Sequence, residues 1–282
     1  MIRRWHIAVL AVLGVLALAC EGGAGAGPKA TGTAGAKGYP SSMAALGDSI
    51  TAAFGSCGTF VVCGRNSWST GTAAAVNSHY RRILAKNPKI EGNAQNFARP
   101  GVQATDLAGQ ASQAVGMKAQ YVTILIGPND ACAPATSGMT SVAAFRTAVD
   151  SALARLKKGL PKADVLVASI PDLYRLWQIG HEDASAVQTW NRLRTCPSMF
   201  ADPTSTAAAD ETRRKLVRDR ISDYDDALRQ ACRAYGSRCR WDGGGVHEAR
   251  FGLEQVNHLD YFHPDVEGQS RLADVTFHRF PW

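Results

Sequence analysis

The sequence predicts an α/β fold, a three-layer α/β/α sandwich around a mostly parallel central sheet. Short apolar runs typical of buried strands recur along the chain, and amphipathic helical patterns lie between them. Strands that alternate with helices pair in parallel. About 240 residues follow position 38, which is enough for one domain with a sizeable core and too few for two ordinary domains.

Five strand candidates are spaced at intervals along the chain. They cover residues 43–46, a short stretch ending near residue 97, and residues 121–126, 165–170 and 240–241. Ligands of parallel sheets bind beyond the carboxyl ends of the strands. The residues that directly follow these runs are therefore candidates for a functional site.

Three helices are expected from the apolar spacing. Between the third and fourth strand candidates, residues 142–156 carry apolar side chains every three or four positions, and Thr140 or Ser141 can cap that helix. A second helix is expected over about 207–235 and a third over 266–277. The residues expected to face inward on the second helix are Leu216, Val217, Ile221, Tyr224 and Leu228.

The N-terminus predicts export. Arg3 and Arg4 precede an apolar run that ends in small residues, which is the layout of a secretory signal peptide over residues 1–19. The run is too short to be read as a membrane-spanning helix. Residues 20–38 are mostly Gly, Ala, Thr, Lys and Pro and are expected to form a flexible tether. The folded domain then covers residues 39–282.

Cys20 directly follows the expected cleavage site. A cysteine at this position resembles the lipobox of bacterial lipoproteins, whose thiol receives a diacylglyceryl group, so Cys20 is a candidate lipidation site. The same small residues also suit ordinary signal peptidase. The protein is therefore expected to be secreted, extracellular or anchored at the cell surface, with membrane association through lipidated Cys20 as one of the two routes.

The other six cysteines are expected to form disulfides, because an even set is typical of an exported chain. Fifteen connectivities are formally open. We favour the pairs Cys57–Cys63, Cys232–Cys239 and Cys132–Cys196. Thiolate zinc sites usually use closer Cys-x-x-Cys pairs, which are absent from this sequence.

The formal net charge of +7 falls to about +5 without the two signal-peptide arginines, a mild excess that suits anionic surfaces or headgroups. The densest basic stretch, residues 213–220, is interleaved with acidic residues and is expected to be a solvated helix face. We therefore expect no nucleic-acid partner.

Four short blocks carry the candidate chemistry. Ser49 lies in Gly-Asp-Ser-Ile-Thr, directly after the first strand candidate, and Asp260 and His263 lie in Asp-Tyr-Phe-His-Pro near the end of the chain. A serine hydroxyl becomes a nucleophile when a histidine removes its proton and a carboxylate orients that histidine. Gly101 of Phe-Ala-Arg-Pro-Gly and Asn129 of Gly-Pro-Asn-Asp offer donors for an oxyanion.

The order and character of these four blocks resemble the SGNH hydrolases, also called the GDSL family. The resemblance covers nearly the whole chain after about residue 40. It implies a serine ester hydrolase without a cofactor, in which Ser49 is the nucleophile, His263 the base and Asp260 the third triad member. It also implies an oxyanion hole formed by Ser49, Gly101 and Asn129.

Simpler roles are also available for these residues. Ser49 could cap a helix that begins near Ile50, and Asp48 and Asp130 are expected to hydrogen-bond nearby backbone groups rather than act in chemistry. A metal site could be imagined from three histidines and an acid, namely His247, His258, His263 and Asp260. Their spacing does not match the helical histidine pair that zinc enzymes commonly use, so we expect no metal.

The substrate is indicated by two weaker features. Residues 65–69, Arg-Asn-Ser-Trp-Ser, resemble a segment of the phospholipase B branch. Residues 173–200 show no clear periodicity and carry much apolar bulk that either packs on the domain or lines an acyl-chain groove. We expect a small-molecule or lipid ester, above all a lipid or phospholipid acyl ester. The alternatives are an acetylesterase for acetylated polysaccharide and a non-catalytic cell-surface binding lipoprotein.

Overall fold

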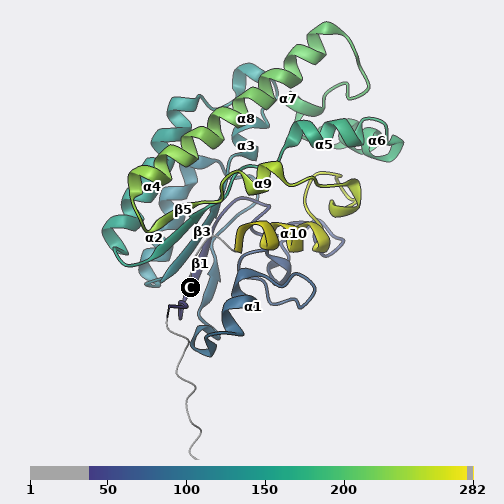
Figure 1. Ribbon diagram of the computed structural model, residues 1–282. Coiled ribbons are helices and arrows are strands. Elements are labelled where there is room, and N and C mark those ends of the chain that lie inside the picture. Colours follow the sequence, from purple (N-terminus) through teal and green to yellow (C-terminus); the bar gives the residue numbers. More distant parts are fainter. Residues whose placement is uncertain (1–37, 278–281) are drawn as a thin grey trace, which may run out of the picture. The chain divides into compact units, whose positions relative to one another are not determined.

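The computed structural model describes residues 38–277 and residue 282 (Figure 1). The expected signal peptide over residues 1–19, the candidate lipidation site Cys20 and the expected tether up to residue 37 lie outside the described residues. Within the described part of the chain, no helix is long and apolar enough to cross a membrane.

The centre of the domain is a sheet of five parallel strands in the order β2-β1-β3-β4-β5. The strands are β1 (Met43–Gly47), β2 (Ala94–Asn96), β3 (Tyr121–Leu125), β4 (Asp164–Val167) and β5 (Cys239–Trp241). Every strand candidate of the sequence lies on one of them. β1 and β3 are buried along their whole length, as expected of strands covered on both faces.

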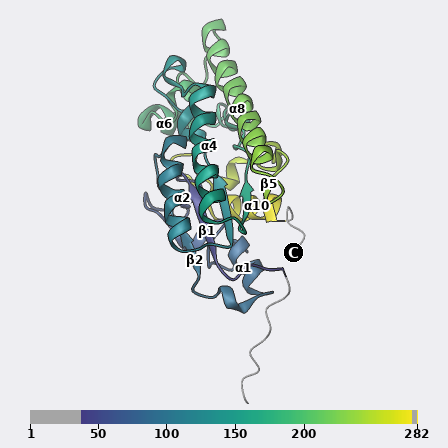
Figure 2. The same ribbon diagram turned by 90° about the vertical axis from the view of Figure 1, so that its left-hand side faces the viewer.

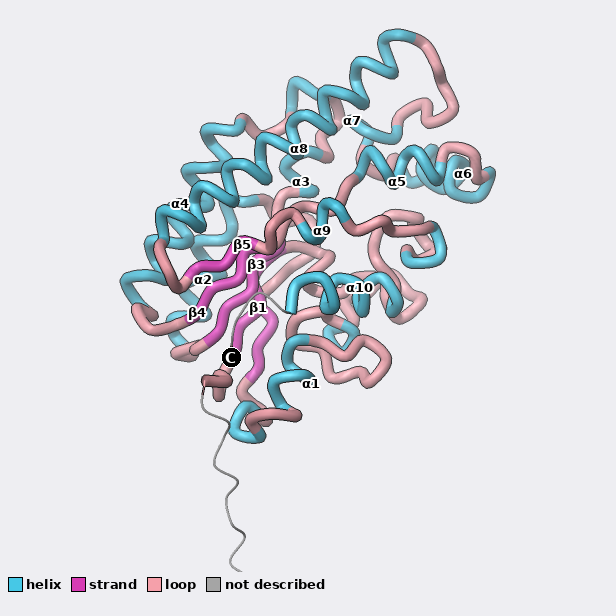
Figure 3. The backbone as a smooth tube through the Cα atoms, viewed as in Figure 1, coloured by secondary structure: helices cyan, strands magenta, loops and turns pink. Residues whose placement is uncertain are grey.

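Helices cover both faces of this sheet, which confirms the predicted three-layer sandwich (Figures 1 and 3). On one face lie α2 (Leu107–Gly116), α4 (Val142–Gly159) and α8 (Ala208–Tyr235), which Figure 2 shows side by side. On the other lie α1 (His79–Leu84) and α10 (Val266–Phe277). Each helix layer encloses its own apolar core against the sheet.

Shorter helices connect these elements. The α-helices are α3 (Pro128–Ala131), α5 (Leu173–Gly180), α6 (Ala184–Leu193), α7 (Pro197–Phe200) and α9 (Gly245–Glu248). The 3₁₀ helices are Gly64–Asn66, Pro88–Ile90, Ala104–Asp106, Thr136–Gly138 and Leu253–Gln255.

The chain reverses its direction of travel across the sheet between β1 and β3. β1 leads to β2 at one edge, whereas β3 leads to β4 and β5 toward the other edge. Such a switch point leaves a crevice beyond the carboxyl ends of the two strands. The loops that follow β1 and β3 therefore border the place where an α/β protein binds its ligand.

The cap of α4 is Ser141 rather than Thr140. The hydroxyl of Ser141 accepts a hydrogen bond from the backbone N–H of Ala144 (3.2 Å). The carbonyl of Thr140 instead accepts hydrogen bonds from the side chains of Arg220 and Tyr224 of α8. Ser141 thus starts α4, and Thr140 joins the preceding loop to α8.

For one residue of α8, the prediction that its side chain faces the core is wrong. Val217, Ile221, Tyr224 and Leu228 are buried, but 49% of Leu216 is exposed. The four buried positions advance by four, three and four residues and so share one face of the helix. Leu216 is one residue, about 100° of rotation, away from that face.

The prediction that the basic residues of α8 are exposed to solvent is also wrong at one position. Arg214 is fully buried, because it lies three residues before Val217 on the buried face. Its guanidinium stacks over the ring of Trp177 (4.2 Å to the centroid), pairs with Glu211 (3.1 Å) and donates to the carbonyl of Ser205 (2.6 Å). These contacts offset the cost of removing its charge from water.

The segment 173–200, expected to lack periodicity, forms α5, α6 and α7. Asp172 and Asp183 cap the first two helices by accepting the backbone N–H groups of Arg175 (2.9 Å) and Ala186 (2.8 Å). Each helix is short, so its apolar face repeats only once or twice in the sequence. Much of the apolar bulk is core: Trp190 is 1% exposed and stacks on a neighbouring phenylalanine.

Among residues 38–277 there are three disulfides: Cys57–Cys63, Cys132–Cys196 and Cys232–Cys239. These are the pairs that the sequence favoured. The second joins the end of α3 to the start of α7 across 64 residues of sequence. In the chain-entropy model, a cross-link of that span restricts the unfolded chain more than the two short ones.

We predict that Leu228→Ala destabilises the protein by about 2–5 kcal/mol, because it leaves a cavity at a fully buried position of α8. Leu216→Ala makes the same chemical change on the same helix at an exposed position, and its effect should stay within about 0.5 kcal/mol. Urea unfolding of both variants measures the difference. Equal effects would show that α8 does not pack by this face.

Candidate active site

Ser49 lies in the turn that follows β1 at the switch point. Gly47, the last residue of β1, has a φ of +143°, and a Cβ there would lie 2.1 Å from the carbonyl oxygen of Leu125 in β3. Only glycine fits this close approach of the two strands. The amide of Gln110 in α2 holds Gly47 in place by accepting from its N–H (2.7 Å) and donating to its carbonyl (2.9 Å).

The residues after Ser49 form turns rather than a helix, so Ser49 caps no helix in the described structure. Its hydroxyl lies 2.8 Å from Nε2 of His263. The other ring nitrogen, Nδ1, lies 2.7 Å from the carboxylate of Asp260. The structure therefore brings together a serine and a histidine that are 214 positions apart, in a line of hydrogen bonds ending on a buried acid.

Backbone hydrogen bonds hold the carboxylate of Asp260 through the oxygen that does not contact His263. Oδ1 accepts the backbone N–H groups of Phe262 (2.9 Å) and His263 (3.0 Å), which leaves Oδ2 for the imidazole. An ionised carboxylate only accepts hydrogen bonds, so Nδ1 of His263 must carry the proton. Nε2 is then an acceptor that faces the Ser49 hydroxyl.

Gly101 and Asn129 follow the strands on either side of β1. Gly101 occupies an exposed turn after β2 with a φ of +78°, and Asn129 lies in α3 directly after β3. The Asn129 side chain donates one N–H to the carbonyl of Val102 (2.9 Å), and Gln103 donates to the Asn129 carbonyl (3.2 Å). An amide nitrogen has two N–H groups, so the second can serve another acceptor.

Asp48 and Asp130 are fully buried beside these loops, and both accept backbone hydrogen bonds as the sequence analysis expected. Asp48 accepts from Ile50 (2.9 Å) and Asp130 from Ala104 (3.0 Å). Burial raises the pKa of Asp48 from 3.8 to about 7 and that of Asp130 to about 6. Loss of hydration disfavours the charged form of each carboxyl.

The segment Arg-Asn-Ser-Trp-Ser at residues 65–69 makes hydrogen bonds to the turn that carries Ser49. Ser67 donates to the carbonyl of Thr51 (2.7 Å), and the indole of Trp68 donates to the Thr51 hydroxyl (3.3 Å). Gln269 of α10 accepts from the Trp68 backbone (2.8 Å) and donates to the carbonyl of Ile50 (2.8 Å). These contacts brace the turn from within the core.

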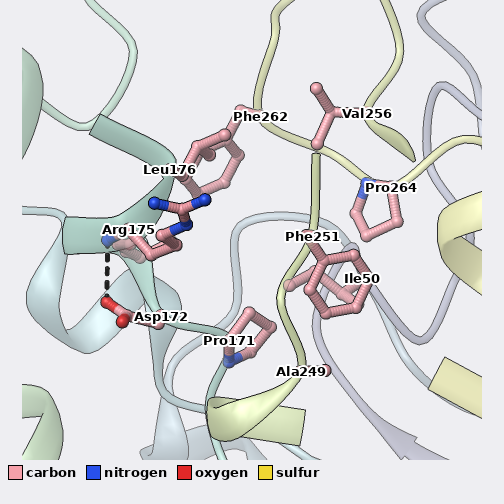
Figure 4. Close-up of a pocket in the computed structure, with 11 residues that line it drawn as sticks. Ile50, Pro171, Asp172, Arg175, Leu176, Ala249, Phe251, Val256, Phe262 and Pro264 are labelled. Carbon is pink, nitrogen blue, oxygen red and sulfur yellow. Dashed lines mark hydrogen bonds between the residues drawn. The ribbon is translucent and has the colours of Figure 1, made fainter. Parts of the chain in front are cut away.

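An apolar pocket lies beside the segments that carry Ser49 and His263, although neither of these two residues lines it (Figure 4). Its wall includes Ile50, the residue after Ser49, and Phe262 and Pro264, the two neighbours of His263. The remaining wall comes from the loop and helix after β4 and from the irregular segment before the histidine block. Those residues are Pro171, Asp172, Leu173, Arg175, Leu176, Ala249, Phe251 and Val256.

Comparison with known protein families decides the assignment. The model of the GDSL-like Lipase/Acylhydrolase family matches residues 43–276. The chain belongs to this family. No curated protein matches its sequence significantly.

Two structures described as lipases are among the solved structures similar to this GDSL-like protein. A GDSL-like lipase from Parabacteroides merdae is 16% identical, with 83% of this chain and 92% of that chain covered and a TM-score of 0.48. An extracellular lipase from Streptomyces rimosus is also 16% identical, covering 83% and 97%, with a TM-score of 0.39.

A carbohydrate esterase family 2 enzyme from Corynascus thermopiles, which carries a carbohydrate-binding domain, is 16% identical to this chain. The match covers 86% of this chain and 65% of that one, with a TM-score of 0.49. Such distant likenesses carry no information about the substrate of the present GDSL-like protein.

Several pocket residues of this GDSL-like chain were missed by the sequence analysis. Phe251 and Val256 lie in an irregular segment where no periodicity marks them, and Arg175 is one of many arginines. The apolar content of residues 173–200 gave a partial signal, since Leu173 and Leu176 do line the pocket. Apolar residues just before a candidate histidine block would have been the best available signal for the rest.

The residues considered for a metal site are not gathered in one place. His258 stacks on the ring of Tyr261 (5.1 Å between centroids), whereas His263 contacts Ser49 and Asp260. Across residues 38–277 and 282, no group of three or more His, Cys, Asp or Glu side chains could hold a metal ion.

A second acid–histidine pair lies at the end of β4. Nδ1 of His247 is 3.3 Å from Oδ2 of Asp225 and 3.0 Å from the carbonyl of Ile170, whose backbone N–H donates to Asp225 (2.9 Å). Burial raises the pKa of Asp225 from 3.8 to about 8. No described hydroxyl side chain hydrogen-bonds the ring of His247. The Asp225–His247 pair therefore lacks the nucleophile that Ser49 supplies to the Asp260–His263 pair.

We predict that Asp225→Asn makes the protein less sensitive to alkaline pH. The unfolded chain loses this proton near pH 4 and the folded protein near pH 8, so the contribution of Asp225 to stability is lost as pH rises across that range. Asparagine keeps an acceptor for Ile170 and cannot ionise. The melting temperature of the variant relative to wild type should therefore be higher at pH 9 than at pH 5.

The matched control is Asp226→Asn, which makes the same charge change at the next, exposed position. Thermal melts of the three proteins at both pH values separate the two effects. If Asp226→Asn shifts the melting temperatures in the same way, net charge rather than burial of Asp225 is responsible.

Proposed function

We propose that this protein is a serine hydrolase that cleaves lipid or phospholipid acyl esters through Ser49, His263 and Asp260. The observation that carries the proposal is the line of hydrogen bonds from the Ser49 hydroxyl through His263 to Asp260, at 2.8 and 2.7 Å. Membership of a family of lipases and acylhydrolases supports ester hydrolysis as the reaction.

In the proposed mechanism Ser49 Oγ attacks the acyl carbonyl while Nε2 of His263 takes its proton. Asp260 holds the imidazole in the required tautomer and stabilises the imidazolium, without becoming protonated itself. The tetrahedral intermediate collapses as His263 gives the proton to the departing alcohol. Water, activated by the same histidine, then attacks the acyl-enzyme and releases the acid.

The developing oxyanion needs donors that are in place before the reaction. We assign this role to the backbone N–H groups of Ser49 and Gly101 and to the side-chain amide of Asn129. Two features support the assignment. All three residues follow neighbouring strands β1, β2 and β3, and the Asn129 amide is already tied to the Gly101 loop through Val102.

The preference for a lipid acyl group is supported by the apolar pocket beside His263. An acetyl group would leave the wall formed by Leu173, Leu176, Phe251 and Val256 without a partner, whereas a longer acyl chain would remove that surface from water. We infer that the pocket holds the acyl chain. Activity on acetylated polysaccharide is the outcome expected if it does not.

Export is the second part of the proposal. Three disulfides are typical of proteins that fold in an oxidising compartment, which agrees with the signal peptide predicted over residues 1–19. We propose that the domain acts outside the cytoplasm, either secreted or held at the membrane through lipidated Cys20.

Asp260→Asn is predicted to lower kcat by roughly 10⁴-fold, because an amide in place of the carboxylate can leave His263 in the wrong tautomer. Asp265→Asn is the matched control. Asp265 lies two residues beyond His263 and accepts from Gly268 at the start of α10, where asparagine caps equally well. Single-turnover and steady-state ester assays measure both. Near-normal activity of Asp260→Asn would remove Asp260 from the mechanism.

For p-nitrophenyl esters from acetate to octanoate, we predict that kcat/KM rises with acyl length. Each buried methylene contributes about 0.8 kcal/mol, so four methylenes held in the transition state favour the longer ester by on the order of 10²-fold. Ser49→Ala sets the background rate for every ester. A steady fall from acetate to octanoate would instead identify an acetylesterase.

The pocket is tested by Leu176→Trp, which should shift the preference toward short esters by filling the acyl site. Leu193→Trp makes the same change at an exposed position of α6 and should leave the chain-length profile unaltered. If the two variants behave alike, the acyl chain binds elsewhere.

A further inference from the structure

Two charged side chains, Asp172 and Arg175, line the otherwise apolar pocket beside His263. The carboxylate of Asp172 is already used, because it caps α5 by accepting the backbone N–H of Arg175 (2.9 Å). Figure 4 shows this carboxylate turned away from the guanidinium of Arg175, which extends on the other side toward Phe262.

The guanidinium of Arg175 makes no hydrogen bond or ion pair with any residue that the structure describes, and its Nε is buried without a partner. Arginines nearby on α8 are different. Arg213 pairs with Asp210 (3.0 Å), and buried Arg214 pairs with Glu211 (3.1 Å). A guanidinium has five N–H donors, and Figure 4 places that of Arg175 beside Leu176 and Phe262 in the pocket wall.

Arg175 is partly buried, and its Nε has lost hydration without gaining a partner, so an anion bound there would supply the missing interaction. Arginine suits phosphate and carboxylate groups because its planar fork can donate two parallel hydrogen bonds. The pocket lies next to the proposed catalytic residues in the chain, since Ile50 follows Ser49 and Phe262 and Pro264 flank His263, although Ser49 and His263 do not line it.

We propose that Arg175 binds an anionic group carried by the substrate, so that the pocket selects esters that combine an apolar acyl chain with a phosphate or carboxylate. The inference rests on the proposed ester hydrolysis and narrows its substrate class to anionic lipids. Neutral acylglycerols of the same chain length fill the apolar wall but leave the guanidinium unpaired.

The test compares kcat/KM for three octanoyl esters below their micellar concentrations: octanoylglycerol phosphate, octanoylglycolate and neutral octanoylglycerol. We expect wild type to prefer at least one anionic ester over the neutral one by about tenfold or more, the usual effect of a charge-assisted hydrogen bond. The preferred anionic ester identifies whether Arg175 binds phosphate or carboxylate.

Arg175→Gln should reduce the ratio of anionic to neutral kcat/KM by at least about tenfold, and Arg175→Lys should retain part of that ratio. Arg250→Gln is the matched control, because Arg250 is an exposed arginine between two pocket residues, Ala249 and Phe251. It should leave the ratio unaltered. Melting temperatures show whether each variant is folded.

Equal turnover of neutral and anionic esters by wild type would overturn the inference without any variant. A loss of the ratio in Arg250→Gln as large as in Arg175→Gln would also overturn it, because general charge steering would then explain the preference. The proposed hydrolysis fails in a different way, namely if wild type cleaves none of the three esters or if Ser49→Ala cleaves them equally well.

Discussion

The close approach of β1 and β3 at Gly47 is the constraint on which the candidate site depends. No side chain fits between this residue and the carbonyl of Leu125, and Gln110 of α2 binds both backbone groups of Gly47. On the opposite face of the sheet, Gln269 of α10 holds the backbone beyond Ser49. Both helix layers thus fix the turn that presents Ser49, so its hydroxyl can stay within reach of the distant histidine block.

Two acid–histidine pairs in this domain illustrate why geometry and not residue type defines a catalytic unit. Asp260 and His263 share one turn, and the free edge of the imidazole faces Ser49. Asp225 and His247 bind each other and the backbone of one strand end, so they join β4, α8 and α9. The first pair suits proton transfer during ester cleavage. The second pair links secondary-structure elements, and its buried acid makes that link sensitive to pH.

Much of the fold could be predicted from the sequence because the local signals were strong. β1 and β3 are largely apolar runs, and α4 has an uninterrupted amphipathic repeat with a serine cap. Prediction failed where the signal was short or the face was ambiguous. Leu216 lies one position off the buried face of α8, whereas Arg214 lies on it and is stabilised by Trp177, a partner from another helix. Residues 173–200 form helices too short to repeat their pattern.

By itself, the sequence determined the strand-helix alternation, the placement of Ser49, Gly101 and Asn129 after strand ends, and the pairing chemistry of Asp260 with His263. These are local properties, set by side-chain pattern and by residues only a few positions apart. Only the tertiary structure decided that the serine and histidine meet, which side chains form the pocket and that the guanidinium within it has no partner. Those features arise where segments more than seventy residues apart pack together, and hydrophobic packing of that kind leaves no periodic trace in the chain.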